Sequence, residues 1–382
     1  MRDAEDQLPA GVCRHPRLAI VLLAAFSFYA SLRPARHISH WVASCWLADY
    51  RLGFVKRGLP GQLLGEGPFD LGQLEVVGRT ILAALVAIAV VAAARVVLRC
   101  VRECPERANG VYGWWLLFAA APFACQQLGI EFGRFDQITL LLIAGALLAI
   151  RLAGPLRWLA VPLVAVCPLV HEASLLLQLP MLFAAWWLRR APGDRAPLAV
   201  ALASTLAVGF CAGRASVHGE ALRGLADHMQ ARAVGFEVYA GLVDLYDHST
   251  VECVRATLER WSWRVVRHLA IVFAICSPLL VLTVRCWRAV GGRRHFLAAG
   301  ACLLAGAPMF VLGVDFFRWL GNLWLCQWLL IASVATHDRS WPRLGAVIQG
   351  APWWSGAALL ASLYVGPIGV TFALDDRWIL VR

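Results

Sequence analysis

Apolar runs recur along almost the whole chain and are separated mostly by short polar segments. A helix that spans a membrane needs about 20 mostly apolar residues. Eleven segments approach that length and composition: 18–32, 80–98, 111–128, 137–151, 157–170, 172–188, 197–213, 268–284, 296–313, 319–335 and 353–373. The pattern predicts an all-α polytopic membrane protein with about 11 transmembrane helices.

The first apolar run has two interpretations. It is short and follows Arg14 and Arg17, which is also typical of a signal peptide. Tyr29 and Arg33 make a poor small-residue cleavage site, so we expect an uncleaved first helix. The segment 1–17 is then a cytoplasmic N-terminus.

Two connections are long and carry amphipathic patterns. In the first, 33–79, apolar residues at helical spacing predict a helix on the membrane surface, with Trp41 and Trp46 at the headgroup level. A second short helix begins near Leu71 and leads into the next span. The second connection, 214–267, carries two apolar stripes that we expect to roof the spans. The stripes are Leu222, Leu225, Met229 and Ala233, and Val251, Val254, Leu258, Trp261 and Val265.

Arginines in the short connections set the orientation, because such connections stay cytoplasmic. With the N-terminus inside, fifteen arginines lie in cytoplasmic connections and only Arg134 and Arg318 lie in short outer ones. The two long connections and the C-terminus are then outside. The arginine-rich composition and the absence of eukaryotic sorting signals favour a bacterial inner (plasma) membrane, with the long loops in the periplasm.

Composition agrees with this class. Hydrophobic residues make up 60% of the chain and charged residues 15%, and the mean hydropathy is +0.66. The net charge of +11 is largely explained by the cytoplasmic arginines, which face anionic lipid headgroups. No basic segment with interleaved aromatic residues predicts a nucleic-acid partner.

The twelve cysteines do not predict a metal framework. Cys100 and Cys104 lack a second Cys or His pair, which argues against zinc. Cys45 and Cys253 are the two cysteines in the outer loops, and the sequence leaves open whether a disulfide joins them.

The ionisable residues that interrupt the apolar spans fall at one face once the spans are threaded. Charge at membrane depth is costly unless it is paired or hydrated, so such a convergence is a hypothesis of function. A shared outward-facing, water-filled cavity would explain it. The residues are Asp49, Arg57, Glu131, Arg134, Asp136, His171, Glu172, Asp315 and Arg318.

Each group has a chemical interpretation and a structural alternative. Asp49 is placed to act as a general base, and Lys56 and Arg57 to bind phosphate, unless the segment is an ordinary solvated loop. Glu131 and Asp136 are candidate ligands for a divalent cation (Mg or Mn). The alternative is that they form local ion pairs with Arg134.

Two further pairs of residues also have both a chemical and a structural interpretation. His171 and Glu172 lie in an outer turn, where they could shuttle a proton or cap a helix. Asp315 and Arg318 are three residues apart, on one helical face. They either neutralise each other or place Arg318 at the same phosphate as Arg57.

This layout resembles the GT-C superfamily of polyprenyl-phosphate-sugar-dependent glycosyltransferases, over roughly residues 18–267. In that family a seven-span module carries a long first outer loop, with two juxtamembrane helices and the catalytic acid. A second long outer loop follows the seventh span. Here the module corresponds to 18–213 with the loop 33–79, the second loop to 214–267, and a variable C-terminal bundle to 268–382.

The resemblance implies a polyprenyl-phosphate-linked sugar donor and a glycan or lipid acceptor of the cell envelope. Asp49 takes the role of catalytic base, while Glu131 and Asp136 match acids that bind metal in some members and orient substrate in others. His171 and Glu172 belong to the third outer turn of the active cavity. The lipid phosphate would be stabilised by Arg57, Arg134 and Arg318. The paired acids usual after the first span are missing here, and Glu66 and Asp70 are alternatives to Asp49.

Three other functions stay open. A polymerase or ligase of lipid-linked polysaccharide would share the outer arginines but need a larger outer loop. A flippase or other transporter would need polar groups in the inner halves of the spans, where only amides such as Gln178 and Gln327 are expected. A non-catalytic subunit of an envelope complex would not need Asp49 and Arg57 to face one cavity.

Overall fold

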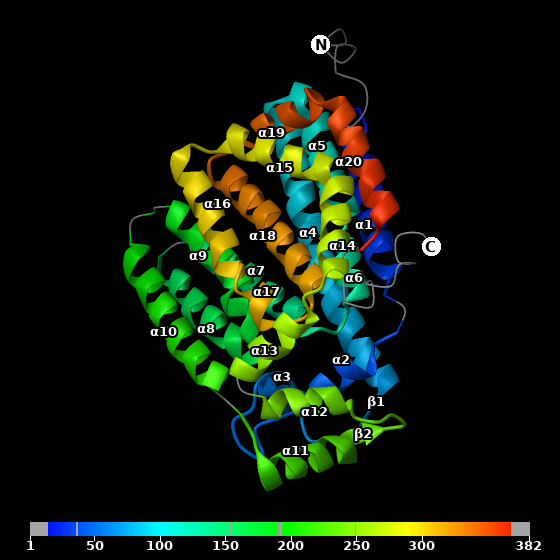
Figure 1. Ribbon diagram of the computed structural model, residues 1–382. Helices are drawn as coiled ribbons and strands as arrows, with labels where there is room; N and C mark the ends of the chain where they lie inside the picture. Colours follow the sequence, from blue (N-terminus) through cyan, green and yellow to red (C-terminus); the bar gives the residue numbers. More distant parts are fainter. Residues whose placement is uncertain are drawn as a thin grey trace.

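The computed structural model describes residues 14–367 except Arg36, Ala153, Arg190, Pro192, Ala215 and Ser249. It is almost entirely helical, with one two-stranded parallel sheet (Figure 1). Its elements are α1 (Pro16–Leu32), α2 (His40–Cys45), α3 (Gly58–Leu64), β1 (Phe69–Asp70), α4 (Leu71–Glu103), α5 (Pro105–Ala120), α6 (Cys125–Ile130), α7 (Phe135–Leu152), η1 (Gly154–Leu159), α8 (Ala160–Val170), η2 (Glu172–Leu175), α9 (Gln178–Arg189), α10 (Arg195–Arg214), α11 (Gly219–Arg232), β2 (Ala233–Val234), α12 (Ala240–Asp247), α13 (Thr250–Arg260), α14 (Trp263–Ile275), α15 (Ser277–Val290), α16 (Arg293–Gly306), α17 (Met309–Leu312), α18 (Phe316–His337), α19 (Trp341–Gln349) and α20 (Pro352–Val365).

Several helices are long and apolar enough to cross a membrane, so the prediction of a multi-pass membrane protein is supported. Within the described residues there are five, or up to six if the bent pair α14 and α15 forms one span. Eleven spans are not confirmed. The five begin at α4, α7, α10, α16 and α18.

Breaks in the helices account for part of the difference, and helices too short to be counted as spans account for the rest. The predicted span 111–128 is divided between α5 and α6 at a turn that contains Pro122. The span predicted at 268–284 bends by 62° between α14 and α15, where Pro278 stands in the first turn of α15 and has no N–H to continue the helix. The last span was predicted to reach residue 373, but α20 ends at Val365 and residues 368–373 lie outside the described part.

The bundle core is held by close helix packing and by aromatic rings. Gly110 of α5 lies against α19, where an added Cβ would come 2.1 Å from the carbonyl oxygen of Gly345. Small residues permit such close approach of two helix backbones. Trp114 stacks on Trp328, and the Trp328 Nε1 donates a 2.9 Å hydrogen bond to Thr283 Oγ1. The sequence prediction missed α19, because that helix is too short to resemble a span.

The two long connections form one cap at the end of the bundle opposite α5 and α19 (Figure 1). We define the cap as α2, α3, β1, α11, β2 and α12. β1 and β2 pair in parallel, with Phe69 opposite Ala233 and Asp70 opposite Val234. The backbone N–H of Tyr239 donates to Ser44 Oγ at 2.9 Å. The first connection is therefore bound to the second.

Helices occur where the amphipathic patterns predicted them, but their setting differs. Trp46 was expected at the lipid headgroups and is instead 4% exposed, with its Nε1 donating to the carbonyl of Gly133 at 2.8 Å. The short helix expected near Leu71 is the first part of the continuous 33-residue helix α4. The stripes in 214–267 fall on α11, α13 and the start of α14.

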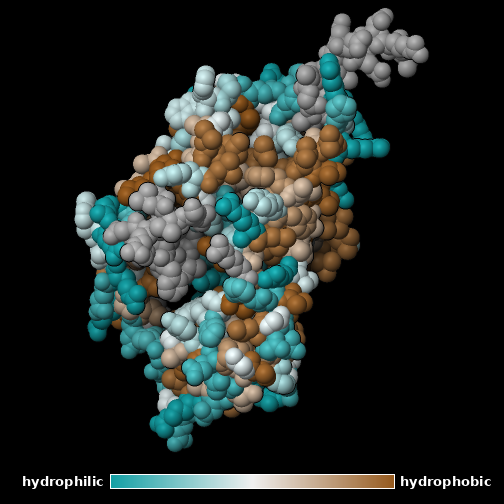
Figure 2. All heavy atoms as spheres, turned by 90° about the vertical axis from the view of Figure 1, so that its right-hand side faces the viewer, coloured by the Kyte–Doolittle hydropathy of each residue, from teal (hydrophilic) through white to brown (hydrophobic). Residues whose placement is uncertain are grey.

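Hydrophobic side chains are gathered between two hydrophilic ends on the face seen in Figure 2. Exposed apolar residues on α20 and α1 include Trp353, Leu360 and Val21. Contiguous exposed apolar surface on this scale is expected where lipid, rather than water, is the neighbour. The cap lies at one of the hydrophilic ends.

Inside the cap, one arginine joins both connections. Arg232 Nη1 donates to Asp49 Oδ2 at 3.0 Å and to the carbonyl of Leu47 at 2.7 Å, and its Nη2 donates to the carbonyl of Gly65. His228 Nε2 lies 2.9 Å from the same Asp49 oxygen. We call Asp49, His228 and Arg232 the cap clamp.

Replacing Arg232 with Met should loosen the cap, because it leaves the Asp49 carboxylate buried without its guanidinium partner. Breaking a buried pair in this way costs about 3–5 kcal/mol. Hydrogen exchange of the amides in 40–70 and 219–247 should accelerate in the variant. Arg223→Met, on the exposed face of α11, is the matched control. Equal exchange in both variants would show that the clamp does not hold the cap.

Candidate functional site

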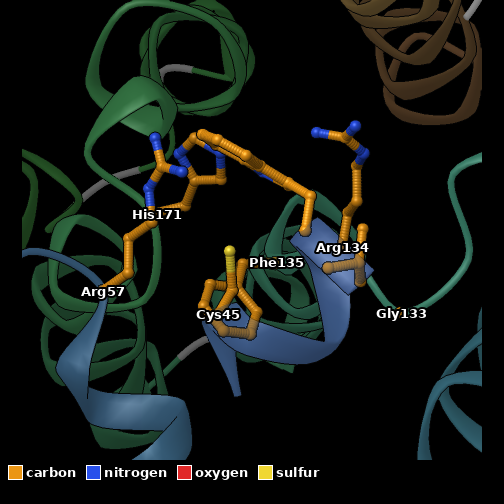
Figure 3. Close-up of a pocket in the computed structure, with 8 residues that line it drawn as sticks. Cys45, Arg57, Gly133, Arg134, Phe135 and His171 are labelled. Carbon is orange, nitrogen blue, oxygen red and sulfur yellow. The ribbon is translucent and has the colours of Figure 1, made fainter. Parts of the chain in front are cut away.

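A pocket with about 250 Å³ of empty space lies between the cap and the bundle. Four segments line it: α2, the residue before α3, the turn from α6 into the start of α7, and the residue after α8. Its lining residues are Trp41, Val42, Cys45, Arg57, Gly133, Arg134, Phe135 and His171. In Figure 3, Arg57 and His171 lie together on one side of Cys45 and Phe135, and Arg134 lies on the other.

Arg57 joins the cap to the bundle in the pocket wall. Its Nε donates to Glu172 Oε2 at 2.9 Å and its Nη2 donates to Oε1 at 2.5 Å. The residue also precedes α3 in a left-handed conformation with φ of 61°, which is uncommon for any residue but glycine and asparagine. Strained backbone of this kind gathers at functional sites when surrounding contacts hold it. The bidentate pair with Glu172 is such a contact.

Behind the pocket, Arg318 is the centre of a buried ionic cluster. It is 3% exposed, and its Nη1 donates to Asp315 Oδ2 at 2.7 Å. Its Nε lies 3.5 Å from Asp136 Oδ2 and 3.8 Å from Glu131 Oε2. Its Nη2 lies 3.3 Å from His171 Nε2. One guanidinium thus contacts three carboxyl groups and an imidazole.

Glu131 carries the clearest electrostatic perturbation at the site. Burial raises the pKa of its carboxyl to about 8, against the opposing effect of Arg134 and Arg318. Its Oε1 is buried without a hydrogen-bond partner in the described part of the chain. Near neutral pH the carboxyl is therefore largely protonated.

Arg134 is the most loosely held cation of the pocket. Its Nε lies 4.0 Å from Glu131 and its Nη1 lies 3.8 Å from Asp315. Among the described residues its guanidinium makes no closer ionic contact. It lines the pocket, and so its donors are available to an anion that enters.

The structure brings together seven of the nine residues expected at one face: Glu131, Arg134, Asp136, His171, Glu172, Asp315 and Arg318. Arg57 joins them through Glu172. Asp49 does not line the pocket, because its carboxylate belongs to the cap clamp. Burial alone would raise the pKa of Asp49, but the hydrogen bonds from His228 and the Arg51 amide and the charge of Arg232 outweigh it and lower the pKa.

The geometry bears on three further points. Lys56 does not reach the pocket; its Nζ lies 3.4 Å from the carbonyl of His248. The described residues contain no group of three or more His, Cys, Asp or Glu side chains arranged to hold a metal ion. The Arg318 guanidinium lies close to both Glu131 and Asp136. Cys45 and Cys253 are both free.

Residues that the sequence argument overlooked complete the site. Gln178, expected in the inner half of a span, donates to Asp136 Oδ1 and to Asn322 Oδ1, both at 3.1 Å. Tyr246 is 1% exposed and its hydroxyl has no partner among the described residues. Trp41 and Cys45 line the pocket as well. Only the amphipathic pattern of 38–46 marked these last two.

No known family model matches the sequence, and no curated protein sequence matches it significantly. The site offers Arg57 and Arg134 at a pocket between a polar cap and an apolar bundle, and the Glu172 carboxylate is paired with Arg57.

The pKa of Glu131 predicts a pH-dependent stability. The folded protein keeps a proton on this carboxyl up to about pH 8, whereas the unfolded chain releases it near pH 4.5. The stability that Glu131 contributes is therefore complete at low pH and is lost as the pH rises towards 8. Glu131→Gln should remove this part of the pH dependence, as seen in thermal unfolding midpoints between pH 5 and pH 9. Glu103→Gln, on an exposed helix end, is the control. An unchanged pH profile in Glu131→Gln would contradict the assignment.

Proposed function

We propose that the protein is an integral membrane glycosyltransferase of GT-C type. It would move a sugar from a polyprenyl-phosphate donor to an envelope glycan or lipid acceptor. In this proposal the chain crosses a bacterial inner membrane about 11 times and the cap faces the periplasm. Membrane lipids surround the bundle, and the donor arrives from them.

The observation that carries the proposal is the pocket between Arg57 and Arg134. Arginine presents a planar fork of donors that matches phosphate, and it stays charged at every relevant pH. Both guanidiniums line a pocket where the polar cap contacts the apolar bundle. A lipid-linked phosphate would enter at such a boundary with its chain still in the bilayer.

The wall of the pocket also offers a contact for the transferred sugar. The Trp41 ring in the pocket wall offers an apolar face to a sugar ring.

The proposed reaction is a single displacement at the anomeric carbon. The acceptor oxygen forms a bond to that carbon, and the bond from the carbon to the phosphate oxygen breaks. Polyprenyl phosphate leaves with the bonding electrons, and Arg57 and Arg134 stabilise the charge that develops on it. The acceptor proton goes to a carboxylate.

Glu172 is our choice for that carboxylate. It is the pocket-side acid whose partner, Arg57, is also a phosphate ligand in this proposal. When the donor phosphate binds Arg57, Glu172 loses two charge-assisted hydrogen bonds and becomes a stronger proton acceptor. His171 Nδ1 lies 3.1 Å from the Ala173 amide and its Nε2 lies 3.3 Å from Arg318 Nη2, so both ring nitrogens are engaged and the imidazole orients rather than deprotonates. Asp49 stabilises the cap.

Sugar transfer by reconstituted protein tests the proposal. With a panel of radiolabelled polyprenyl-phosphate sugars, the wild type should transfer from at least one donor. Arg57→Gln should lower the rate about 10²–10³-fold, as is typical for the loss of a group that stabilises developing charge. Glu172→Gln should lower it about 10²–10⁴-fold. Arg51→Gln is the matched control, since Arg51 pairs with Glu66 on the cap surface.

Asp49→Asn distinguishes the two candidate bases. Collapse of transfer in folded Asp49→Asn, with activity kept in Glu172→Gln, would move the base to Asp49. No transfer from any donor by folded wild type would contradict the glycosyltransferase proposal and direct the assay to lipid-linked oligosaccharides.

A further inference from the structure

A second pocket lies at the opposite end of the bundle from the cap, between the end of α9, the start of α16 and the end of α18 (Figure 1). It has about 190 Å³ of empty space. Leu188 and Val334 give it an apolar wall, and Arg189, His295, His337 and Asp338 give it a polar one. No residue of this pocket takes part in the proposed transfer reaction.

Arg189 presents an unused donor to this pocket. Its Nη1 is buried and has no hydrogen-bond partner among the described residues. Its Nε lies 3.9 Å from Asp194 Oδ2, while the other Asp194 oxygen accepts a 2.9 Å hydrogen bond from Arg157. Asp194 is therefore shared between two arginines and does not saturate Arg189. A buried guanidinium N–H without an acceptor is costly, and a bound anion would remove that cost.

The two histidines supply further donors. The Gly292 N–H donates to His295 Nδ1 at 3.1 Å, so a neutral imidazole carries its proton on Nε2. That Nε2 lies 3.6 Å from Asp338 Oδ2, and His337 Nε2 lies 3.9 Å from Asp338 Oδ1. Both distances are longer than a hydrogen bond allows. Asp338 is one-third exposed at the rim, so its carboxylate can turn to solvent when an anion reaches the imidazoles.

The surroundings match an anionic headgroup. Exposed arginines at the same end include Arg293, Arg294, Arg339 and Arg343. The exposed apolar side chain of Leu297 on α16 lies one turn from this end of the bundle. Basic pockets between membrane helices recognise phosphate headgroups of anionic lipids, while the acyl chains stay against apolar helix faces.

We propose that the pocket bounded by Arg189, His295 and His337 binds a phosphate group at the membrane surface away from the cap. Arg189 Nη1 and the imidazole Nε2 atoms donate to the phosphate oxygens. Leu188 and Val334 contact the apolar part of the ligand. The phosphate comes from the headgroup of an anionic phospholipid or from a free phosphate, and the two sources differ in a binding experiment.

Full-length protein, delipidated in a nonionic detergent, is titrated with phosphatidylglycerol, phosphatidylcholine or inorganic phosphate. Native mass spectrometry and thermal unfolding report binding. We expect phosphatidylglycerol to bind at least about tenfold more tightly than phosphatidylcholine, and Arg189→Gln to remove that preference. Arg343→Gln changes the same charge at the same end without lining the pocket, so it should behave like wild type.

Stabilisation by inorganic phosphate that Arg189→Gln abolishes would also support the site and assign it to a soluble phosphate. Equal affinity for both lipids with no effect of phosphate, or equal losses in Arg189→Gln and Arg343→Gln, would overturn the proposal. If Arg189→Gln does not fold, the more exposed His337→Asn replaces it and should weaken binding by a smaller factor. No change in His337→Asn would overturn the proposal as well.

Discussion

Arg318 is a full positive charge held inside an apolar bundle, and the arrangement of the surrounding helices follows from that. A buried charge is tolerated only when partners replace the water it has lost. Its partners come from the residue before α18, from the turn after α6 and the first turn of α7, and from the residue after α8, at separations of 2.7–3.8 Å. Moving any of these segments would leave a charge without compensation. The cluster therefore fixes the cap-side ends of three helices relative to one another.

The same electrostatic requirement connects the bundle to the cap. Glu172 follows directly after His171, a member of the Arg318 cluster, and it pairs with Arg57 at the edge of the cap. Arg57 holds α3 in place while its own backbone is in the left-handed region. A ligand that binds Arg57 would compete with Glu172 and so weaken the contact between the cap and the bundle. Ligand binding in the pocket and the position of the cap are therefore coupled.

The sequence predicted the helical membrane class because hydropathy reports burial in lipid directly. It also predicted the convergence of Glu131, His171, Asp315 and Arg318, because alternating spans bring the same ends together. It failed where long-range contacts decide the outcome. The sequence predicted that Asp49 is an acid of the active cavity. In the structure its carboxylate pairs with Arg232, which lies 183 residues later in the chain. The sequence predicted that Trp46 lies at the lipid headgroups, but its ring is buried and donates to the Gly133 carbonyl.

The breaks in the helices and the charged partners of the acids were beyond the pattern for similar reasons. Hydropathy windows pass over a proline or a turn, so they joined α5 to α6 and straightened the bend between α14 and α15. Two acids five residues apart suggest a cation site, and nothing in their spacing shows that Arg318 lies beside them. The hydrophobic pattern does not show which basic residue of another helix will lie next to a given acid.

The parallel pairing of β1 with β2 has a consequence for how the chain is made. Phe69 cannot pair with Ala233 until the ribosome has added more than 160 further residues, including the helices α4 to α10. At a synthesis rate of about 5–20 residues per second, this takes roughly 10–30 s. During that interval the first half of the cap, with Asp49 and Trp46, has no second half to cover it.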